Sequence, residues 1–196
     1  MPRLNSICIF CGANHGLDPV YEKVARDVGR QLALEQRQIV YGAGSVGLMG
    51  VIADAALAEG GYVVGVIPTF LKEKEVDHKG IQEVIVTDTM HVRKQTMVDR
   101  SEGFIALPGG LGTLDELAEI LSWAQLGLHR HPVGILNVNG YFDQLIAFVD
   151  HSVAQGFVRQ ENREIILVDD DLTRLLAKME AYEAPDVEKW LNREGL

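Results

Sequence analysis

The sequence contains few cysteines, few aromatic residues and too little positive charge to balance its acidic side chains. It has 2 cysteines and 6 prolines among 196 residues, and 7% of its residues are aromatic. Two cysteines cannot supply the disulfide framework of a small secreted domain. The 18 lysines and arginines are outnumbered by 28 aspartates and glutamates, which gives a formal net charge of −10. A chain with this charge repels nucleic acids and anionic membranes, so neither is an expected partner.

Long hydrophobic runs are also missing. No apolar run approaches the roughly 18 residues that a membrane-spanning helix needs. The N-terminal segment MPRLNSICIF lacks the cleavage pattern of a signal peptide, so a cytoplasmic location is expected. The hydrophobic fraction of 47% and the charged fraction of 23% are typical of a globular protein and exclude a disordered chain. We therefore predict one domain over residues 1–196.

The two cysteines and the histidines offer little chemistry. Cys8 and Cys11 form a lone C-x-x-C, but the segment ICIFCG has the pattern of a strand rather than of a helix start. Residues three apart on a strand point to opposite faces, so two buried thiols are predicted. His129 and His131 lie close together in the sequence without a set of Cys, Asp or Glu ligands beside them. They are assigned to a loop, and no metal site is predicted.

Short apolar segments alternate with amphipathic segments along the chain. Strands are predicted at residues 6–11, 38–41, 62–67, 83–86, 104–107, 133–136 and 164–168. Helices are predicted at residues 18–34, 48–58, 89–100, 114–126, 142–155 and 172–182, with a last short helix opening at Pro185. Segments such as VVGVI and FIAL are apolar throughout, which is typical of a parallel sheet covered on both faces. We predict a single doubly wound, Rossmann-like α/β domain with a mainly parallel sheet of about seven strands.

In such a fold the ligand lies outside the carboxyl ends of the strands, and three predicted strand ends carry unusual residues. The first is IALPGGLGTLDE, in which a strand passes through Gly109, Gly110 and Gly112 and enters a helix near Thr113. Glycines let backbone N–H groups approach an anion, and the helix N-terminus adds partial positive charge. This is not the common P-loop, because no lysine follows the last glycine. A phosphate site is predicted, and a plain tight turn is the structural alternative.

Glu116 closes the same segment and has two interpretations. Thr113 to Glu116 has the T-x-x-E form of a capping box, in which the glutamate bonds back to the N–H of the cap residue. A carboxylate beside a phosphate-binding turn could instead act on a reacting sugar.

The second strand end is YGAGSVGLMG, where Gly42, Gly44 and Gly47 form G-x-G-x-x-G. A dinucleotide-binding fingerprint should follow the first strand, and the next strand should end in an acidic residue. Here the pattern follows the second strand and the next one ends at Ile67 and Pro68, which argues against NAD binding. Close approach of some other nucleotide remains open.

The third strand end leads into TDTMHVRKQTM, which places Arg93 and Lys94 next to one another on a predicted helix. Arginine can bind a phosphate or a base edge with two hydrogen bonds. The alternative is an ordinary solvated helix face.

Taken together, these motifs resemble the lonely guy family of cytokinin-activating phosphoribohydrolases, a group often mislabelled as lysine decarboxylases. The family pattern PGGxGTxxE is matched by PGGLGTLDE at residues 108–116. Further matching segments are GLMG, MHVRK, WAQLG and PVGILNVNGYF, at residues 47–50, 90–94, 123–127 and 132–142. Ala43 departs from the family, which usually has YGGG at this point.

The resemblance implies hydrolysis of the N-glycosidic bond of N6-substituted adenosine 5′-monophosphates, or of AMP, without a metal or organic cofactor. Arg93 and Glu116 match the catalytic pair of the family. The residues expected to bind substrate are Gly44, Ser45, Glu75, Met90, Lys94, Gly109, Gly110, Leu111, Gly112, Thr113 and Ser122. The family forms homodimers with sites near the subunit interface, and the apolar segment ELAEILSWAQLGL is the expected contact surface.

The chemistry agrees with these residue types. Glycosidic cleavage develops positive charge on the ribose, which a carboxylate stabilises, and negative charge on the leaving base, which a cation such as Arg93 offsets. Arginine is a poor proton donor, so its expected role is electrostatic. Two rivals are a non-catalytic nucleotide-binding module, disfavoured because Arg93 and Glu116 are both present, and a nicotinamide or flavin oxidoreductase, disfavoured by the misplaced glycine motif. Lysine decarboxylation finds no support in the residues.

Overall fold

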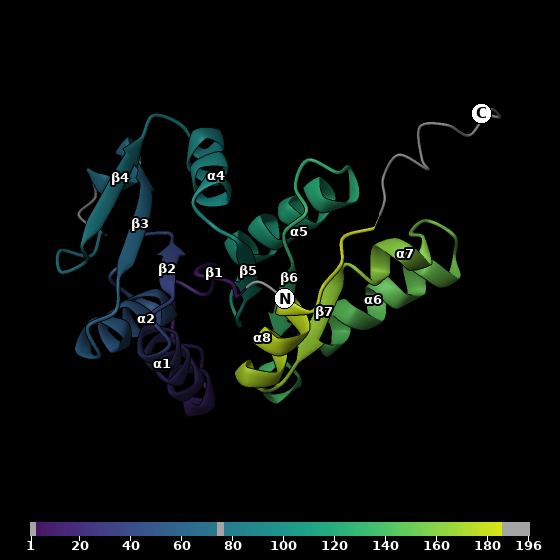
Figure 1. Cartoon of the computed structure of the whole chain (residues 1–196), viewed down its shortest axis with the longest axis horizontal. Coiled ribbons are helices and arrows are strands. Elements are labelled where there is room, and N and C mark those ends of the chain that lie inside the picture. Colours follow the sequence, from purple (N-terminus) through teal and green to yellow (C-terminus); the bar gives the residue numbers. More distant parts are fainter. Residues whose placement is uncertain (1–2, 74–76, 186–196) are drawn as a thin grey trace.

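The computed structural model describes residues 3–73 and 77–185. Within these ranges, seven strands form one sheet in the order β4-β3-β2-β1-β5-β6-β7, and each neighbouring pair is parallel (Figure 1). The strands are β1 (Ser6–Phe10), β2 (Gln38–Tyr41), β3 (Val63–Pro68), β4 (Glu83–Thr87), β5 (Gly103–Ala106), β6 (Val133–Leu136) and β7 (Ile166–Asp169). The predicted Rossmann-like α/β class is confirmed. That the whole chain forms a single domain stays a prediction.

Helices connect the strands. They are α1 (Pro19–Leu34), α2 (Gly47–Ala58), α3 (Thr69–Lys72), α4 (Met90–Asp99), α5 (Leu111–Gln125), η1 (Val138–Gly140), α6 (Asp143–Ala154), α7 (Gln160–Arg163) and α8 (Leu172–Glu180). Three N-caps among the described helices have the side-chain geometry expected of Asp and Thr at such positions. Asp18 accepts a hydrogen bond from the N–H of Val20 at 2.9 Å, Thr89 accepts one from Val92 at 3.2 Å, and Asp171 accepts one from Arg174 at 2.9 Å.

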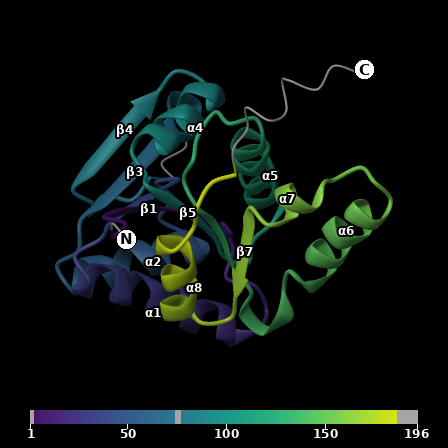
Figure 2. The same cartoon turned by 45° about the vertical axis from the view of Figure 1, so that its right-hand side comes forward.

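The sheet is covered on both faces, as its apolar strands predict. On one face, side chains such as Ile7 and Ile9 of β1 pack against α1, α2 and α8. On the other, Cys8 and Phe10 pack against α4 and α5 (Figures 1 and 2). Successive side chains of β1 thus enter opposite cores because side chains alternate along a strand.

The strand order reverses between β1 and β5. From β1 the chain moves outward through β2 and β3 to β4, then returns to the other side of β1 as β5. These two strands are in register, with Phe10 opposite Ala106, so both end at the same edge of the sheet. Segments that leave adjacent strands in different directions create a crevice at that edge, where ligands of this fold class bind.

Several element boundaries differ from the predicted ones. β1 ends at Phe10, one residue early, and Cys11 begins the following loop, but both cysteines are buried free thiols as predicted. The two short helices α3 and α7 were not predicted, since four residues carry too little periodicity. The helix predicted to open at Pro185 lies outside the described residues.

Candidate active site

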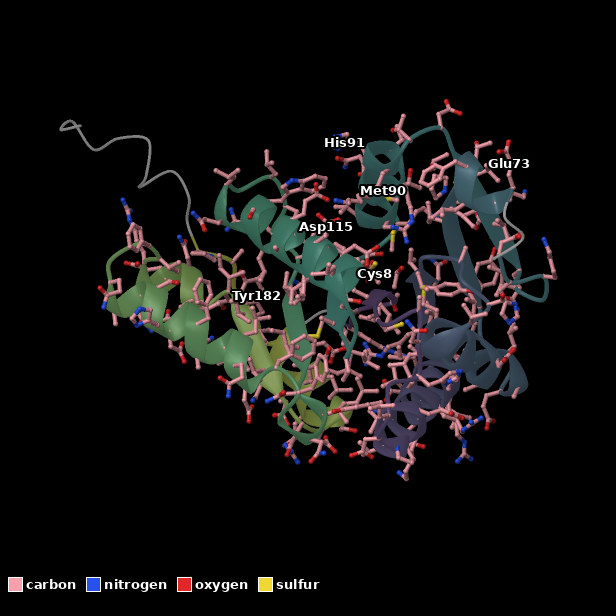
Figure 3. The ribbon with its side chains drawn as sticks, turned by 180° about the vertical axis from the view of Figure 1, so that it is seen from behind. Cys8, Glu73, Met90, His91, Asp115 and Tyr182 are labelled. Atoms are coloured by element: carbon pink, nitrogen blue, oxygen red, sulfur yellow. The ribbon has the colours of Figure 1, made fainter. Side chains whose placement is uncertain are left out.

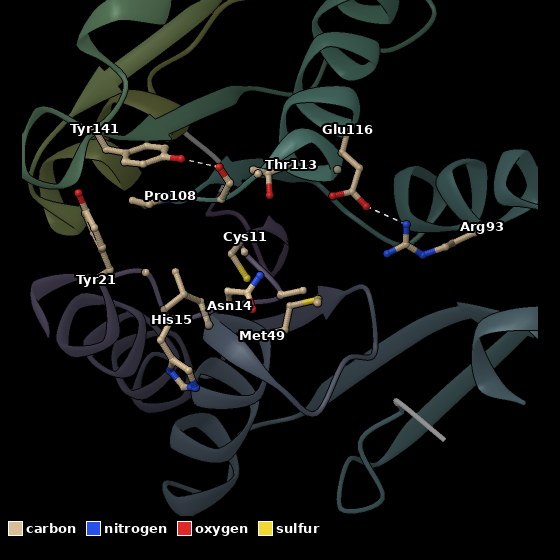
Figure 4. A pocket seen from close by; sticks show the side chains of 17 residues that line it. Cys11, Asn14, His15, Tyr21, Met49, Arg93, Pro108, Thr113, Glu116 and Tyr141 are labelled. Atoms are coloured by element: carbon tan, nitrogen blue, oxygen red, sulfur yellow. Dashed lines mark hydrogen bonds and ion pairs between the residues drawn. The ribbon is translucent and has the colours of Figure 1, made fainter. Parts of the chain in front are cut away.

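A cavity of about 430 Å³ lies at the carboxyl ends of β1 and β5 (Figure 4). Three backbone segments line it, at residues 11–16 after β1, 48–49 at the start of α2, and 108–110 with 112–113 at the start of α5. The side chains of Tyr21, Arg93, Glu116 and Tyr141 complete the wall. The cavity therefore occupies the position that the strand reversal predicts.

Backbone contacts hold the three segments together. The N–H of Gly12 donates to the carbonyl of Pro108 at 3.0 Å, and the N–H of Leu48 donates to the carbonyl of Gly12 at 3.0 Å. Gly109 is required for this approach, because a Cβ there would lie 2.2 Å from Thr113 Oγ1 and 2.8 Å from the nitrogen of Gly12. The cavity wall is thus built from loops that are far apart in sequence and tied to one another through their main chains.

The start of α5, residues 109–113, has the geometry expected of an anion-binding turn and is called the anion-binding turn below, although its ligand stays a prediction. Gly110 is the N-cap and makes no side-chain capping bond. The first helical hydrogen bond runs from the N–H of Leu114 to the carbonyl of Gly110 at 3.1 Å. The N–H groups of the residues before Leu114 therefore have no acceptor within the helix. A Cβ at Gly110 or at Gly112 would meet nothing within 4 Å. Protein packing does not require glycine at these two positions, whereas the close approach of an anion to the backbone does.

The capping-box interpretation of Thr113 and Glu116 is wrong. Because α5 begins at Leu111, Thr113 is the third helical residue and Glu116 lies in the second turn. The Glu116 carboxylate instead accepts a hydrogen bond from Arg93, with Nη1 and Oε1 2.8 Å apart. The sequence pattern was misleading because the helix starts at the glycines, three residues earlier than its apolar periodicity indicates.

Arg93 and Glu116 form a buried ion pair between α4 and α5. Their side chains are only 10% and 13% exposed. The Nε of Arg93 also donates to the carbonyl of Val66 in β3 at 3.0 Å, which fixes the plane of the guanidinium. Burial raises the pKa of the Glu116 carboxyl above its ordinary value, and the charge of Arg93 offsets part of that rise. The solvated-face interpretation is therefore wrong for Arg93.

The end of β2 leaves room for this arginine. A Cβ at Gly42 would lie 2.3 Å from Arg93 Nη2 and 3.3 Å from the sulfur of Met49. The sulfur of Met90 lies 3.5 Å from Arg93 Nη1. Gly42, the first glycine of the second motif, thus leaves the space that the guanidinium of Arg93 occupies.

Lys94 points between α4 and α5. Its ammonium lies 2.8 Å from Asp115 and 3.0 Å from Glu119 (the two helices are side by side in Figure 3). Burial alone would lower the pKa of Lys94, but the hydrogen bonds and charges of the two carboxylates outweigh it and raise the pKa. These contacts tie the two helices that carry Arg93 and Glu116.

The structure brings together part of the expected site. The cavity is lined by Arg93, Glu116, Gly109, Gly110, Gly112 and Thr113. It is not lined by Gly44, Ser45, Met90, Lys94, Leu111 or Ser122. The hydroxyl of Ser122 donates to the carbonyl of Ala118 at 2.7 Å, and Leu111 is exposed at the first position of α5. Glu75 lies outside the described residues, and the substrate contacts of all these residues stay predictions.

Sequence reasoning missed the loop after β1 and two tyrosines. Asn14 and His15 of that loop line the cavity, as do Tyr21 and Tyr141, whose rings meet edge to face at 5.6 Å. The fold rule could have indicated the loop, because β1 is central and its end faces the crevice. Tyr141 lies in the family-matching segment at residues 132–142, but nothing in that segment indicated that its side chain lines the cavity. Cys11 also lines the cavity, but burial raises the pKa of its thiol far above the ordinary value, so it is not a nucleophile at neutral pH.

Metal ligands do not gather in the described part of the chain. Across residues 3–73 and 77–185, no group of three or more His, Cys, Asp or Glu side chains could hold an ion. His129 is buried, with Nε2 2.9 Å from the carbonyl oxygen of Ile120. In the same ranges, no helix is long and apolar enough to cross a membrane. A cofactor-free reaction and a cytoplasmic location stay predictions.

Fold and site together define a Rossmann-like α/β protein with an anion-binding turn beside a buried carboxylate–guanidinium pair. The family described as "possible lysine decarboxylase" matches residues 49–179. A probable cytokinin riboside 5′-monophosphate phosphoribohydrolase of Oryza sativa subsp. japonica is 46% identical over 180 residues, which cover 92% of this chain and 79% of the relative. A cytokinin riboside 5′-monophosphate phosphoribohydrolase of Arabidopsis thaliana is 43% identical over 181 residues, 92% of this chain and 79% of the relative. The chain belongs to the lonely guy family, as its motifs predict.

Solved structures show the same fold at lower sequence identity. The molybdenum cofactor binding protein of Rippkaea orientalis has a TM-score of 0.68 and 23% identity, covering 91% of this chain and 97% of that chain. The Moco carrier protein of Chlamydomonas reinhardtii has a TM-score of 0.67 and 20% identity, covering 92% and 98%. At these identities the likeness concerns the fold alone.

Proposed function

We propose that the chain hydrolyses the N-glycosidic bond of N6-substituted adenosine 5′-monophosphates, of AMP, or of both, to free base and ribose 5-phosphate. The observation that carries this proposal is the buried pair of Arg93 and Glu116, 2.8 Å apart, in one cavity with an anion-binding turn. The names of the relatives in rice and Arabidopsis, at 46% and 43% identity, support the same reaction.

The turn at the start of α5 binds the substrate, and Glu116 and Arg93 act on the bond that breaks. The 5′-phosphate binds the N–H groups at the start of α5, which holds the ribose beside Glu116. As the bond between C1′ and the base nitrogen breaks, positive charge develops on the ribose, and the carboxylate of Glu116 stabilises it and orients a water. The water oxygen bonds to C1′ and the departing base takes up a proton. Arg93 offsets the negative charge that builds on the base, and remains protonated throughout.

Lysine decarboxylation, which the family description names, does not fit the lining of the cavity. A pyridoxal phosphate enzyme needs a lysine to hold the cofactor as a Schiff base. In the described ranges no lysine lines the cavity, and the Lys94 ammonium lies between Asp115 and Glu119.

Incubation with AMP and with isopentenyladenosine monophosphate tests the reaction. The expected result is equimolar free base and ribose 5-phosphate from at least one of them. The ratio of the two rates decides between a cytokinin nucleotide and AMP as the preferred substrate. Nucleotide binding without release of base would favour the non-catalytic alternative, and carbon dioxide from lysine would refute the proposal.

The anion-binding turn also predicts that the substrate must carry a 5′-phosphate. Because its N–H groups need an anion, adenosine should be a poorer substrate than AMP by at least about 100-fold in kcat/KM. Comparable turnover of nucleoside and nucleotide would show that the turn does not bind the phosphate.

We also propose that the chain forms a homodimer through the face of α5 and α6. An apolar groove of about 280 Å³ runs between these helices, lined by side chains such as Leu121, Ile146 and Phe148. In α6, none of the residues is buried, and Phe148 is 65% exposed. In the expected contact segment, Leu126 is also 65% exposed, while Trp123 packs against the core. The homodimers of the family support a second copy of this chain as the occupant.

Sedimentation at micromolar concentration tests the dimer. Wild type should sediment as a dimer, and Phe148→Glu should sediment as a monomer. Phe157→Glu is the matched control, because Phe157 is 89% exposed and lies outside the groove. A wild-type monomer would refute the dimer, and a dimer insensitive to Phe148→Glu would place the interface elsewhere.

A further inference from the structure

Tyr141 stands at one end of the cavity, and nothing in the sequence motifs gives it a role. Its hydroxyl donates a hydrogen bond of 2.6 Å to the carbonyl oxygen of Gly109 (Figure 4). We propose that Tyr141 is a positioning residue for the anion-binding turn, and that it holds the peptide between Gly109 and Gly110 in the orientation that binds the 5′-phosphate. This inference rests on the proposed function, because the phosphate is that of the nucleotide substrate.

The peptide between Gly109 and Gly110 joins two flexible residues, so a hydrogen bond such as that from Tyr141 is needed to fix its orientation. A peptide unit is planar and trans, so the N–H of Gly110 points opposite to the carbonyl of Gly109. Glycine adopts many backbone conformations, and a Cβ at Gly110 would meet nothing within 4 Å, so packing around it does not select one. A hydrogen bond on the carbonyl of Gly109 selects the direction of the Gly110 N–H at the same time.

Tyr141 itself is firmly placed. It follows η1, where the side chain of Asn137 accepts from the N–H of Phe142 at 2.8 Å and donates to Asp143 at 2.7 Å. Its ring meets that of Tyr21 on α1 edge to face at 5.6 Å. A donor held in this way loses little conformational entropy when the turn closes on a ligand.

The loop of Tyr141 is also joined to the start of α1. The side chain of Asn139 donates to the carboxylate of Asp18, the N-cap of α1, at 3.3 Å. The loop after β6 therefore makes hydrogen bonds both to the start of α1 and to the turn that precedes α5.

The consequence for catalysis follows from where the hydroxyl acts. It orders a group that binds the phosphate, which is present in the bound substrate and in the transition state alike. Loss of such an interaction raises KM and leaves kcat nearly unchanged. A net hydrogen bond corresponds to a change in affinity of about three- to tenfold.

Tyr141→Phe tests the proposal, because it removes the hydroxyl and keeps the ring against Tyr21. The measurements are kcat and KM for AMP, the dissociation constant of ribose 5-phosphate by calorimetry, and competitive inhibition by adenosine. KM and the ribose 5-phosphate constant should rise about three- to tenfold, with kcat within about twofold and adenosine inhibition unchanged. Tyr62→Phe is the matched control, since its hydroxyl is 3.5 Å from Glu83 and lies outside the cavity, and it should change none of these values.

Each outcome separates this proposal from the proposed reaction. Equal affinity of wild type and Tyr141→Phe for ribose 5-phosphate would overturn the positioning role. A parallel loss of adenosine affinity would also overturn it, because the whole cavity would then be disturbed. Wild type that binds ribose 5-phosphate but releases no base from either AMP or isopentenyladenosine monophosphate would refute the reaction and leave the comparison of ribose 5-phosphate affinities valid. Wild type that binds neither AMP nor ribose 5-phosphate would overturn both.

Discussion

Replacing Glu116 by glutamine separates the catalytic charge of this side chain from its place in the fold. Glutamine has the same length, and its amide oxygen can accept the bond that Arg93 now donates to Glu116 at 2.8 Å. It cannot supply the negative charge that the ribosyl cation requires. Turnover of AMP should fall at least about 100-fold, which is roughly 2.7 kcal/mol of barrier.

The expected effect on stability follows from the pKa of Glu116. Burial raises this pKa in the folded protein, so between the ordinary and the raised value the folded state binds more protons than the unfolded chain. The free energy of unfolding then decreases as pH rises through that window. At neutral pH the ionised carboxylate therefore destabilises the folded state relative to the unfolded chain. A neutral glutamine should leave the free energy of unfolding within about 1 kcal/mol of wild type, or raise it slightly, so Tm should shift by less than about 4 °C.

Glu180 offers a matched control, because its pKa is shifted in the opposite direction to that of Glu116. Its carboxylate accepts from the buried Arg37 at 2.7 Å and from the N–H of Leu4 at 3.2 Å. Burial alone would raise the pKa of Glu180, but these hydrogen bonds hold it below its ordinary value. The ionised form therefore stabilises the fold above the ordinary pKa, and this stabilisation is lost as pH falls through the lowered value. Glu180→Gln should lower the free energy of unfolding by about 1–2 kcal/mol and leave turnover unchanged.

Thermal unfolding and base release are measured on the same purified samples. The reasoning requires Glu116→Gln to lose activity while it keeps its Tm, and Glu180→Gln to lose Tm while it keeps its activity. A Glu116→Gln protein that unfolds early but retains full activity per folded molecule would show that Glu116 is structural. The proposed mechanism would then be wrong.

Three further predictions concern the same site. Gly112→Ala should raise the free energy of unfolding by about 0.5–1 kcal/mol, because its Cβ meets nothing within 4 Å in a helix, yet raise KM for AMP because the methyl occupies the place of the phosphate; a lower Tm or an unchanged KM would contradict this. The kcat/KM for AMP should fall on acidification through a pKa above that of an ordinary glutamate, since burial raises the pKa of Glu116 and the ionised form is the active one; a profile that stays flat down to the ordinary glutamate range would refute the role of the carboxylate. Arg93→Ala should abolish turnover and also lower the free energy of unfolding in urea by about 3 kcal/mol, because it leaves the Glu116 carboxylate buried without its partner; an unchanged urea midpoint would contradict the burial argument.

Much of the fold was predictable because its signals are local. The helices predicted to begin near residues 18 and 89 are confirmed, and Asp18 and Thr89 are their N-caps. The unbroken apolar strands predicted a parallel sheet with two covered faces. The start of α5 was predicted wrongly, because glycines hide a helix start from any rule based on apolar periodicity.

The site was predictable only in part. The glycines within residues 109–113 predicted an anion-binding turn, since the backbone N–H groups expected to bind the anion all belong to one short segment. The burial of Arg93 was not predictable from MHVRK, because a basic residue on a helix is solvated unless another element covers it. Tyr141 was part of a family-matching segment, but its contact with Gly109 was not predictable, since the two residues are 32 positions apart in the sequence.

By itself, the sequence determined the α/β class, the family motifs and the position of the anion-binding turn, all of which depend on residues within a few positions of one another. Tertiary structure alone decided that Arg93 and Glu116, 23 residues apart, form a buried pair. It also decided that the loop after β1 and the tyrosine after β6 wall the same cavity. The physical reason is that the strand order, which reverses at β1 and β5, and the packing of α4 against α5 set these distances through long-range contacts.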